Sequence, residues 1–160
     1  MRLLAFETSC DETSAAVIEN NRVISNVVSS QIGVHAEYGG VVPELATREH
    51  LKNLQPVIRE ALKLASCSVQ DLKAVAATRG PGLPPALMIG WKAAQAFAYS
   101  AGLPLIGVNH VAAHLYSPWF VSSQTHKFLE DIEPNVSLIV SGGHTVLVRV
   151  TGALKHIILG

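Results

Sequence analysis

The chain lacks an excess of either positive or negative charge, and it lacks a long apolar run. Its 12 Lys and Arg residues balance its 12 Asp and Glu residues, and no run of five basic residues occurs. Bulk charge therefore neither identifies a nucleic-acid partner nor excludes one that binds smaller patches. No apolar run reaches the roughly 18 residues of a membrane span, so we expect no membrane partner. Met1 leads directly into a strand-like segment without a signal or transit peptide, which predicts a cytoplasmic protein.

Cysteine is also scarce. Cys10 and Cys67 are the two cysteines, and their wide separation is not typical of a disulfide framework. This usage favours a reducing compartment. Only 15% of the residues are charged and 49% are hydrophobic, which excludes a disordered chain. A composition with this many apolar residues is typical of a sheet that is buried on both faces.

The hydrophobic pattern predicts a mixed α/β fold. Pro56 is expected to kink or split the first long helix, whose apolar stripe includes Leu51 and Leu54, and Gly102 is expected to end the second. Strands are predicted at 2–6, 14–18, 22–28, 73–78 and 104–108, with helices from Val42, over 86–101 and from His110. The order βββαβαβα is typical of the ribonuclease H-like lobe of the actin/Hsp70/sugar-kinase superfold. This analogy concerns architecture and does not by itself assign a function.

The opening pattern returns near the end of the sequence. Strands are predicted at 136–140, 146–150 and 154–159, with a tight polar turn after the first. We therefore expect an actin-like lobe over residues 1–121, a connector over 122–135, and the first three strands of an incomplete second lobe over 136–160. Three antiparallel strands alone leave an apolar face unburied, so these strands need a packing partner.

The pair His110 and His114 is the strongest candidate for chemistry. Residues four apart share one face of a helix, and this spacing lets two imidazoles bind one metal ion. The pair follows the strand predicted at 104–108, so it would lie at the carboxyl end of a strand, where α/β sheets bind ligands. A helix with two hydrogen-bonded histidines and no metal is the alternative explanation.

A metal at this pair needs a third ligand, because two imidazoles complete neither a tetrahedral nor an octahedral shell. Asp11, Glu12 and His144 are candidates within the chain, and a ligand from outside it is an equal alternative. Val111–Ala113 stand between the histidines, so the glutamate base of the zinc-peptidase helix is missing there. The sequence therefore disfavours a peptidase.

Two polar turns follow the first strands of the two repeats. The segment Glu7–Thr13 carries hydroxyls and carboxylates that could hold a phosphate or a metal, although a plain hairpin loop explains it equally well. The segment Ser141–Thr145 contains Gly142 and Gly143, which let backbone N–H groups approach an anion closely. Facing each other across a cleft, the two turns would hold the phosphates of a nucleotide.

These segments together resemble the TsaD (Gcp/YgjD, Qri7-like) family of tRNA N(6)-adenosine threonylcarbamoyltransferases. The matching pieces follow the family's order along the chain: Glu7–Thr13, Tyr38–Ala46 with Arg48 and His50, Gly80–Leu83, Asn109–His114 and Ser141–His144. The resemblance implies a longer, two-lobed enzyme of which this chain is the N-terminal part. It also implies transfer of threonylcarbamoyl from threonylcarbamoyl-AMP to the exocyclic amine of the adenosine beside the tRNA anticodon.

The resemblance further implies roles by position. His110 and His114 would be ligands of one Fe²⁺ or Zn²⁺ per subunit, with an aspartate late in the second lobe as third ligand. Asp11 and Glu12 match acidic residues lining the cleft and are the candidate catalytic residues. The substrate-binding segment, whose backbone would hold the phosphates of ATP or threonylcarbamoyl-AMP, matches Ile139, Val140, Ser141, Gly142 and Gly143. The implied partners are tRNA, a paralogous TsaB-like subunit and a small TsaE-like ATPase.

Two other interpretations share the fold. A related carbamoyltransferase, of the hydrogenase-maturation or antibiotic-tailoring kind, would have the same histidine pair. The segments Glu7–Thr13 and Tyr38–Ala46 favour TsaD over these relatives. A non-catalytic partner subunit is the third possibility, and the intact pair His110 and His114 argues against it, because a scaffold has no need of a metal site.

Overall fold

The computed structural model describes residues 1–20, 22–120, 132–141 and 145–160. The chain forms two compact units, residues 1–110 and residues 111–160, and each is described by itself. The lobe boundaries expected from the sequence stay predictions, and most of the connector at 122–135 lies outside the described residues. Among the described helices, none is both long and apolar enough to span a membrane.

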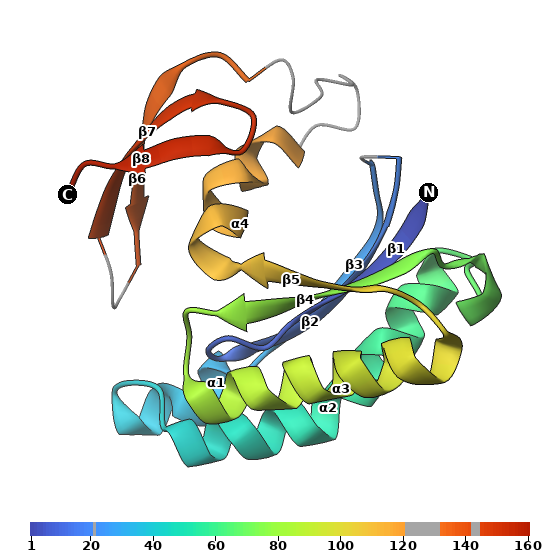
Figure 1. The fold of residues 1–160 in the computed structure, drawn as a ribbon. Coiled ribbons are helices and arrows are strands. Elements are labelled where there is room, and N and C mark those ends of the chain that lie inside the picture. Colours follow the sequence, from blue (N-terminus) through green and yellow to red (C-terminus); the bar gives the residue numbers. More distant parts are fainter. Residues whose placement is uncertain (21, 121–131, 142–144) are drawn as a thin grey trace. The chain divides into compact units, whose positions relative to one another are not determined.

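The first unit is built on a five-stranded sheet with the order β3-β2-β1-β4-β5 (Figure 1). The opening meander consists of β1 (Arg2–Glu7), β2 (Glu12–Glu19) and β3 (Arg22–Ser30). The later strands β4 (Ala74–Gly80) and β5 (Leu105–Asn109) run parallel to β1. The predicted order βββαβαβα is confirmed, and the carboxyl ends of β1, β4 and β5 meet at one edge of the sheet.

Two long helices, α2 (Pro43–Leu64) and α3 (Pro84–Ala101), cover one face of this sheet (Figure 1). The short elements α1 (Ile32–His35), η1 (Ala36–Tyr38) and η2 (Val69–Asp71) fill the connections. Gly102 caps α3 in the left-handed conformation, as predicted. Of the predicted kink or split at Pro56, the split does not occur, because α2 continues through Pro56 as one helix of 22 residues. Pro56 is exposed, so water can bond the carbonyl that lacks its helical donor.

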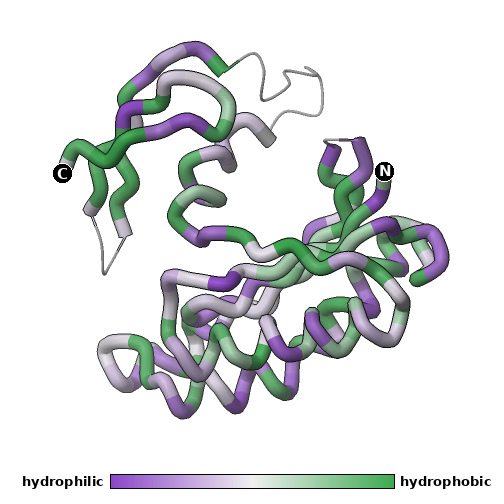
Figure 2. The backbone as a smooth tube through the Cα atoms, viewed as in Figure 1, coloured by the Kyte–Doolittle hydropathy of each residue, from purple (hydrophilic) through white to green (hydrophobic). Residues whose placement is uncertain are grey.

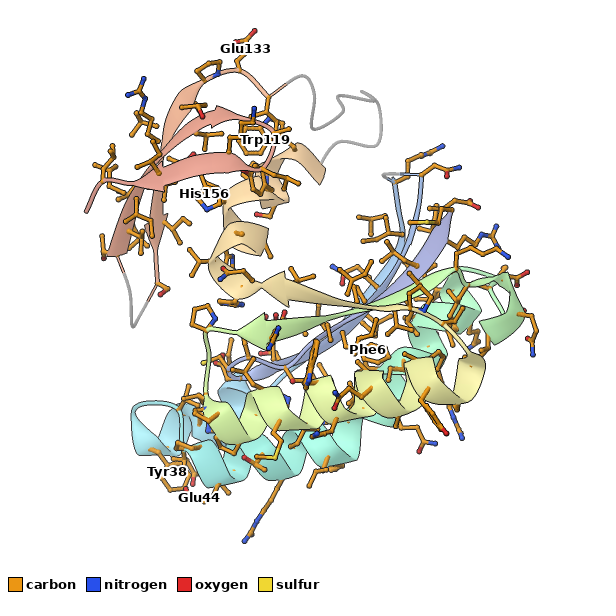
Figure 3. The ribbon with its side chains drawn as sticks, in the orientation of Figure 1. Phe6, Tyr38, Glu44, Trp119, Glu133 and His156 are labelled. Atoms are coloured by element: carbon orange, nitrogen blue, oxygen red, sulfur yellow. The ribbon has the colours of Figure 1, made fainter. Side chains whose placement is uncertain are left out.

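The core of the first unit lies between the sheet and the helices. Phe6 projects from β1 into it (Figure 3) and meets Phe97 of α3 edge to face, with ring centroids 6.1 Å apart. The expected place of Leu51 in the apolar stripe is wrong, because its side chain is 66% exposed. The buried face of α2 is instead made by Ala46, His50, Leu54, Val57 and Ala61. The prediction used apolar residues only, so it left out the buried His50 and placed the exposed Leu51 on the inner face of α2.

The second unit contains the sheet β6-β7-β8, formed by β6 (Asn135–Val140), β7 (Thr145–Gly152) and β8 (Lys155–Ile158). The helix α4 (His110–Tyr116) leads into η3 (Ser117–Phe120) and supplies the cover that these strands need. Apolar side chains of this unit pack together as Leu115, Tyr116, Trp119, Ile132, Ile139, Val146, Val148 and Val150. Hydrophobic residues run along β6 (Figure 2), and those that alternate with Ile139 are exposed.

Candidate functional site

The candidate site of the first unit lies at the carboxyl edge of the parallel strands. β1 ends at Glu7, β4 ends at Gly80, and β5 ends at Asn109, directly before His110. In open α/β sheets, ligands bind beyond this edge. A pocket of about 250 Å³ is lined there by Arg79, Gly80, Gly107, Val108 and Asn109.

A charged carboxylate stands at the centre of this edge. Glu7 accepts hydrogen bonds from the backbone N–H of Ser9 and from the hydroxyl of Thr78, and its Oε2 lies 3.5 Å from Nδ1 of His110. Burial by itself raises the pKa of Glu7, but the hydrogen bonds from His110, Ser9 and Thr78 outweigh burial and lower this pKa to about 2. Glu7 is therefore an anion at neutral pH. The sequence predicts a possible phosphate or metal role for the turn Glu7–Thr13 as a whole, and it does not single out Glu7.

Two side chains lie within reach of the Nδ1 nitrogen of His110. Its Nδ1 lies 3.0 Å from Oγ of Ser9 as well as 3.5 Å from the Glu7 carboxylate. Both neighbours can accept a hydrogen bond, which favours the tautomer with the proton on Nδ1. A hydroxyl or carboxylate in this position is typical of histidines that bind a metal through Nε2.

The histidine pair fits only part of a metal centre. His110 and His114 both lie on α4, four positions apart as predicted. Within residues 1–20, 22–120, 132–141 and 145–160, no group of three or more His, Cys, Asp and Glu side chains could hold a metal ion. Of the candidate third ligands Asp11, Glu12 and His144, His144 lies outside the described residues. The donors therefore fit Fe²⁺ or Zn²⁺ if further ligands come from elsewhere.

The candidate catalytic acids lie on the turn between β1 and β2. Asp11 is half-buried, and Glu12 is exposed as the first residue of β2. The thiol of Cys10, beside them, favours its protonated form at neutral pH. Partial burial, together with the charges of Asp11 and Glu7, raises the pKa of its thiol to about 11. A protonated thiol is a poor nucleophile, so Asp11 and Glu12 stay the predicted catalytic residues of this turn.

Close packing anchors this turn to α3. The Thr8 hydroxyl donates to the carbonyl of Ala86 (2.8 Å) and accepts from the N–H of Gly90 (3.2 Å). The carbonyl of Ser9 accepts from the N–H of Leu83 (2.7 Å). A Cβ atom on Gly82 would lie 2.6 Å from the Ser9 carbonyl oxygen, and one on Gly90 would overlap the Thr8 hydroxyl. Glycine is therefore required at both positions by close approach.

The Gly90→Ala variant is expected to destabilise the chain by about 1–3 kcal/mol, because the added methyl overpacks a buried contact. Alanine is the better helix former by about 1 kcal/mol, so propensity alone predicts the opposite sign. Urea unfolding of the chain measures the difference. The control is Gly33→Ala in α1, where a Cβ meets nothing within 4 Å. A Gly90→Ala variant at least as stable as the natural chain would contradict the packing argument.

The predicted substrate-binding segment lies in the second unit. Ile139 is half-buried in the apolar cluster of that unit, whereas Val140 and Ser141 are exposed at the end of β6. Gly142 and Gly143 lie outside the described residues. The phosphate-binding role of this segment therefore stays a prediction.

Similarity to solved structures defines the class of protein. YeaZ from Pseudomonas aeruginosa matches 99% of this chain, and 64% of its own, with a TM-score of 0.63 at 20% identity. The ROK hexokinase from Thermus thermophilus matches 99% of this chain, and 49% of its own, with a TM-score of 0.55 at 18% identity. These likenesses confirm the predicted fold, the first lobe of the actin/Hsp70/sugar-kinase superfold.

Sequence comparison gives the family. The family model described as "TsaD: tRNA N6-adenosine threonylcarbamoyltransferase" matches residues 22–160. Proteins of that name from Pelobacter propionicus and Trichlorobacter lovleyi are 48% and 49% identical to this chain over its whole length. The chain belongs to the TsaD family, as the sequence motifs predict. It spans 45% of the length of each of these two relatives.

Proposed function

We propose that this chain is part of an enzyme that transfers threonylcarbamoyl from threonylcarbamoyl-AMP to N6 of the adenosine beside the anticodon in tRNA. The main support is that proteins named tRNA N6-adenosine threonylcarbamoyltransferase are about half identical to the chain over its whole length. The arrangement at the carboxyl edge supports the same proposal. It combines the carboxylate turn with a histidine held at Nδ1 by Ser9.

The transfer requires a nucleophile to lose a proton and a phosphate to leave. The adenosine amine forms a bond to the carbamoyl carbon, the bond from that carbon to the AMP phosphate oxygen breaks, and N6 gives up one proton. We assign acceptance of this proton to the acidic turn, to Asp11 or Glu12, since a positioned carboxylate can act as general base. The AMP group departs with the bonding electron pair on its phosphate oxygen.

His110 and His114 would hold one Fe²⁺ or Zn²⁺ together with ligands that lie outside the described residues. Such a metal supplies Lewis-acid stabilisation of negative charge on a phosphate or carbamoyl oxygen. Ser9 and Glu7 orient His110 for this task through its Nδ1. The backbone of Ile139–Gly143 would bind the phosphates of ATP or threonylcarbamoyl-AMP.

The complete protein is proposed to work in the cytoplasm with tRNA, a TsaB-like paralogous subunit and a TsaE-like ATPase. Membership in the TsaD family supports this proposal. The chain offers one structural argument beside them. Its fold is similar to that of YeaZ, so a partner of related fold would match it in architecture.

The deciding experiment offers the complete protein two substrates. Threonylcarbamoyl-AMP plus tRNA is expected to yield threonylcarbamoyladenosine, and carbamoyl phosphate is expected to yield no carbamoylated product. Activity on carbamoyl phosphate alone would favour a related carbamoyltransferase. Activity on neither, with the partner proteins present, would favour a non-catalytic subunit.

Variants of the acidic turn test the proposed base. Asp11→Asn and Glu12→Gln remove one carboxylate each without changing side-chain size. The variant that lacks the base is expected to lose about 10²–10⁴-fold in transfer rate. If both variants transfer at the natural rate, the proton acceptor is not in this turn.

A further inference from the structure

Four buried polar side chains lie behind the acidic turn and have no part in the proposed chemistry. They come from β2, from the connection between β3 and α1, from α1 and from α2. Their exposed fractions are 0% for Thr13, 1% for Gln31, 4% for His35 and 0% for His50. Polar groups this deeply buried are costly unless they are hydrogen-bonded, so their pairing defines the arrangement.

The hydrogen bonds of His50 fix its tautomer. Its Nε2 lies 3.0 Å from the carbonyl oxygen of Cys10, which can only accept, so Nε2 carries the proton. Its Nδ1 is then an acceptor, and it lies 2.8 Å from the Thr13 hydroxyl and 3.3 Å from Nε2 of Gln31. Burial lowers the pKa of His50, which agrees with this neutral form.

The same logic continues to a second histidine. Nε2 of His35 lies 3.1 Å from Oε1 of Gln31 and donates to it. Nδ1 of His35 accepts from the backbone N–H of Val42 at 3.4 Å. The four side chains thus form a hydrogen-bonded row in the order Thr13, His50, Gln31, His35. Every donor in this row meets an acceptor when both imidazoles are neutral. The row therefore has one consistent arrangement, and it joins the loop before α2 to the acidic turn.

The row holds the backbone on both sides of the candidate acids. His50 binds the carbonyl of Cys10, and the N–H of Gln31 donates to the carbonyl of Asp11 at 3.0 Å. The hydroxyl of Thr13, the residue that follows Glu12, donates to Nδ1 of His50. Three bonds from buried groups thus restrain the stretch from residue 10 to residue 13. Asp11 and Glu12 are the two residues between the points that His50 contacts.

We propose that His50 is a positioning residue, which sets the place of the Asp11 and Glu12 carboxylates by binding the Cys10 carbonyl and the Thr13 hydroxyl at once. The catalytic importance of that placement rests on the proposed function. The placement itself does not, and it can be measured on the chain without substrate, metal or partner.

The reactivity of the Cys10 thiol reports on the position of this turn. In a Cys67→Ser background, Cys10 carries the one thiol that iodoacetamide can alkylate. In the natural turn the thiol stays protonated, because burial and nearby carboxylates disfavour the thiolate. His50→Leu frees the Cys10 carbonyl, so the thiol is expected to move away from the carboxylates that raise its pKa. A fall of one unit in this pKa raises the thiolate fraction tenfold, so the alkylation rate near pH 8 is expected to rise at least about tenfold.

Two variants separate positioning from loss of stability. His50→Gln keeps a donor for the Cys10 carbonyl and an acceptor for Thr13, and is expected to react at nearly the natural rate. Leu54→Ala truncates a buried side chain one turn further along α2 without touching the turn, and is also expected to leave the rate unchanged. The proposal is overturned if His50→Leu reacts at the natural rate, or if Leu54→Ala accelerates alkylation as much.

Transfer assays of the complete protein distinguish this inference from the proposed function. If His50→Leu accelerates alkylation of Cys10 while Asp11→Asn and Glu12→Gln transfer normally, His50 positions the turn and the role given to its acids is wrong. If His50→Leu lowers transfer while alkylation is unchanged, the positioning inference is overturned and the acids keep their proposed role.

Discussion

The His110→Ala and His114→Ala variants of the complete protein are each expected to lose bound iron or zinc and at least about 100-fold of the transfer rate. The reason is that each substitution removes one nitrogen ligand, and the chain has no described cluster of three donors that could compensate. Metal analysis after desalting measures the first effect, and formation of threonylcarbamoyladenosine measures the second.

A histidine outside the pair provides the control for this experiment. His156 lies in β8 (Figure 3). Its ring packs edge to face on Tyr116, with the ring centroids 6.1 Å apart. His156→Ala is expected to keep the metal. Retention of stoichiometric metal by both His110→Ala and His114→Ala would refute the assigned site.

Glu7→Gln is expected to destabilise the metal-free chain by about 2–3 kcal/mol at neutral pH. Folding lowers the pKa of Glu7 from 4.5 to about 2, so the folded state favours the carboxylate. One unit of pKa is worth about 1.4 kcal/mol, and solvent screening weakens this stabilisation because the Glu7 side chain is 32% exposed. This stabilisation is present above pH 4.5 and is lost as the pH falls toward 2.

Urea unfolding at several pH values measures this linkage. The stability difference between the natural chain and Glu7→Gln is expected to shrink as the pH falls from about 5 to about 2.5, because acid protonates the natural residue as well. Glu37→Gln, at an exposed position in η1, is the matched control substitution. A constant difference for Glu7→Gln would contradict the assigned ionisation.

Elements with a regular apolar pattern could be predicted from the sequence alone. The strand expected at 73–78 matches β4 (Ala74–Gly80) closely, because its residues are buried along nearly the whole strand. Gly102 was predicted to end a helix because a left-handed cap favours glycine. The inner face of α2 was misassigned at Leu51, since a buried histidine carries no hydrophobic signal.

Residues of the candidate site could be predicted only where a pattern of neighbouring residues in the sequence marks them. His110 was placed at the carboxyl end of a strand because a short apolar run precedes it. The contact between His110 and Glu7 joins residues 103 positions apart, and no local pattern encodes such a contact. The hydrogen bond from the Gly90 N–H to Thr8 spans 82 positions. Such contacts depend on the order of strands in the sheet.

The fit between Thr8 and α3 has a consequence for how this protein can vary. A side chain at position 90 would occupy the space of the Thr8 hydroxyl, so any residue larger than glycine there requires a smaller partner at position 8. The two positions must change together. Because Ser9 is the next residue along the chain, a mismatched pair would also shift the hydroxyl beside His110. A substitution on the buried face of a helix could in this way alter reactivity without touching any reacting group.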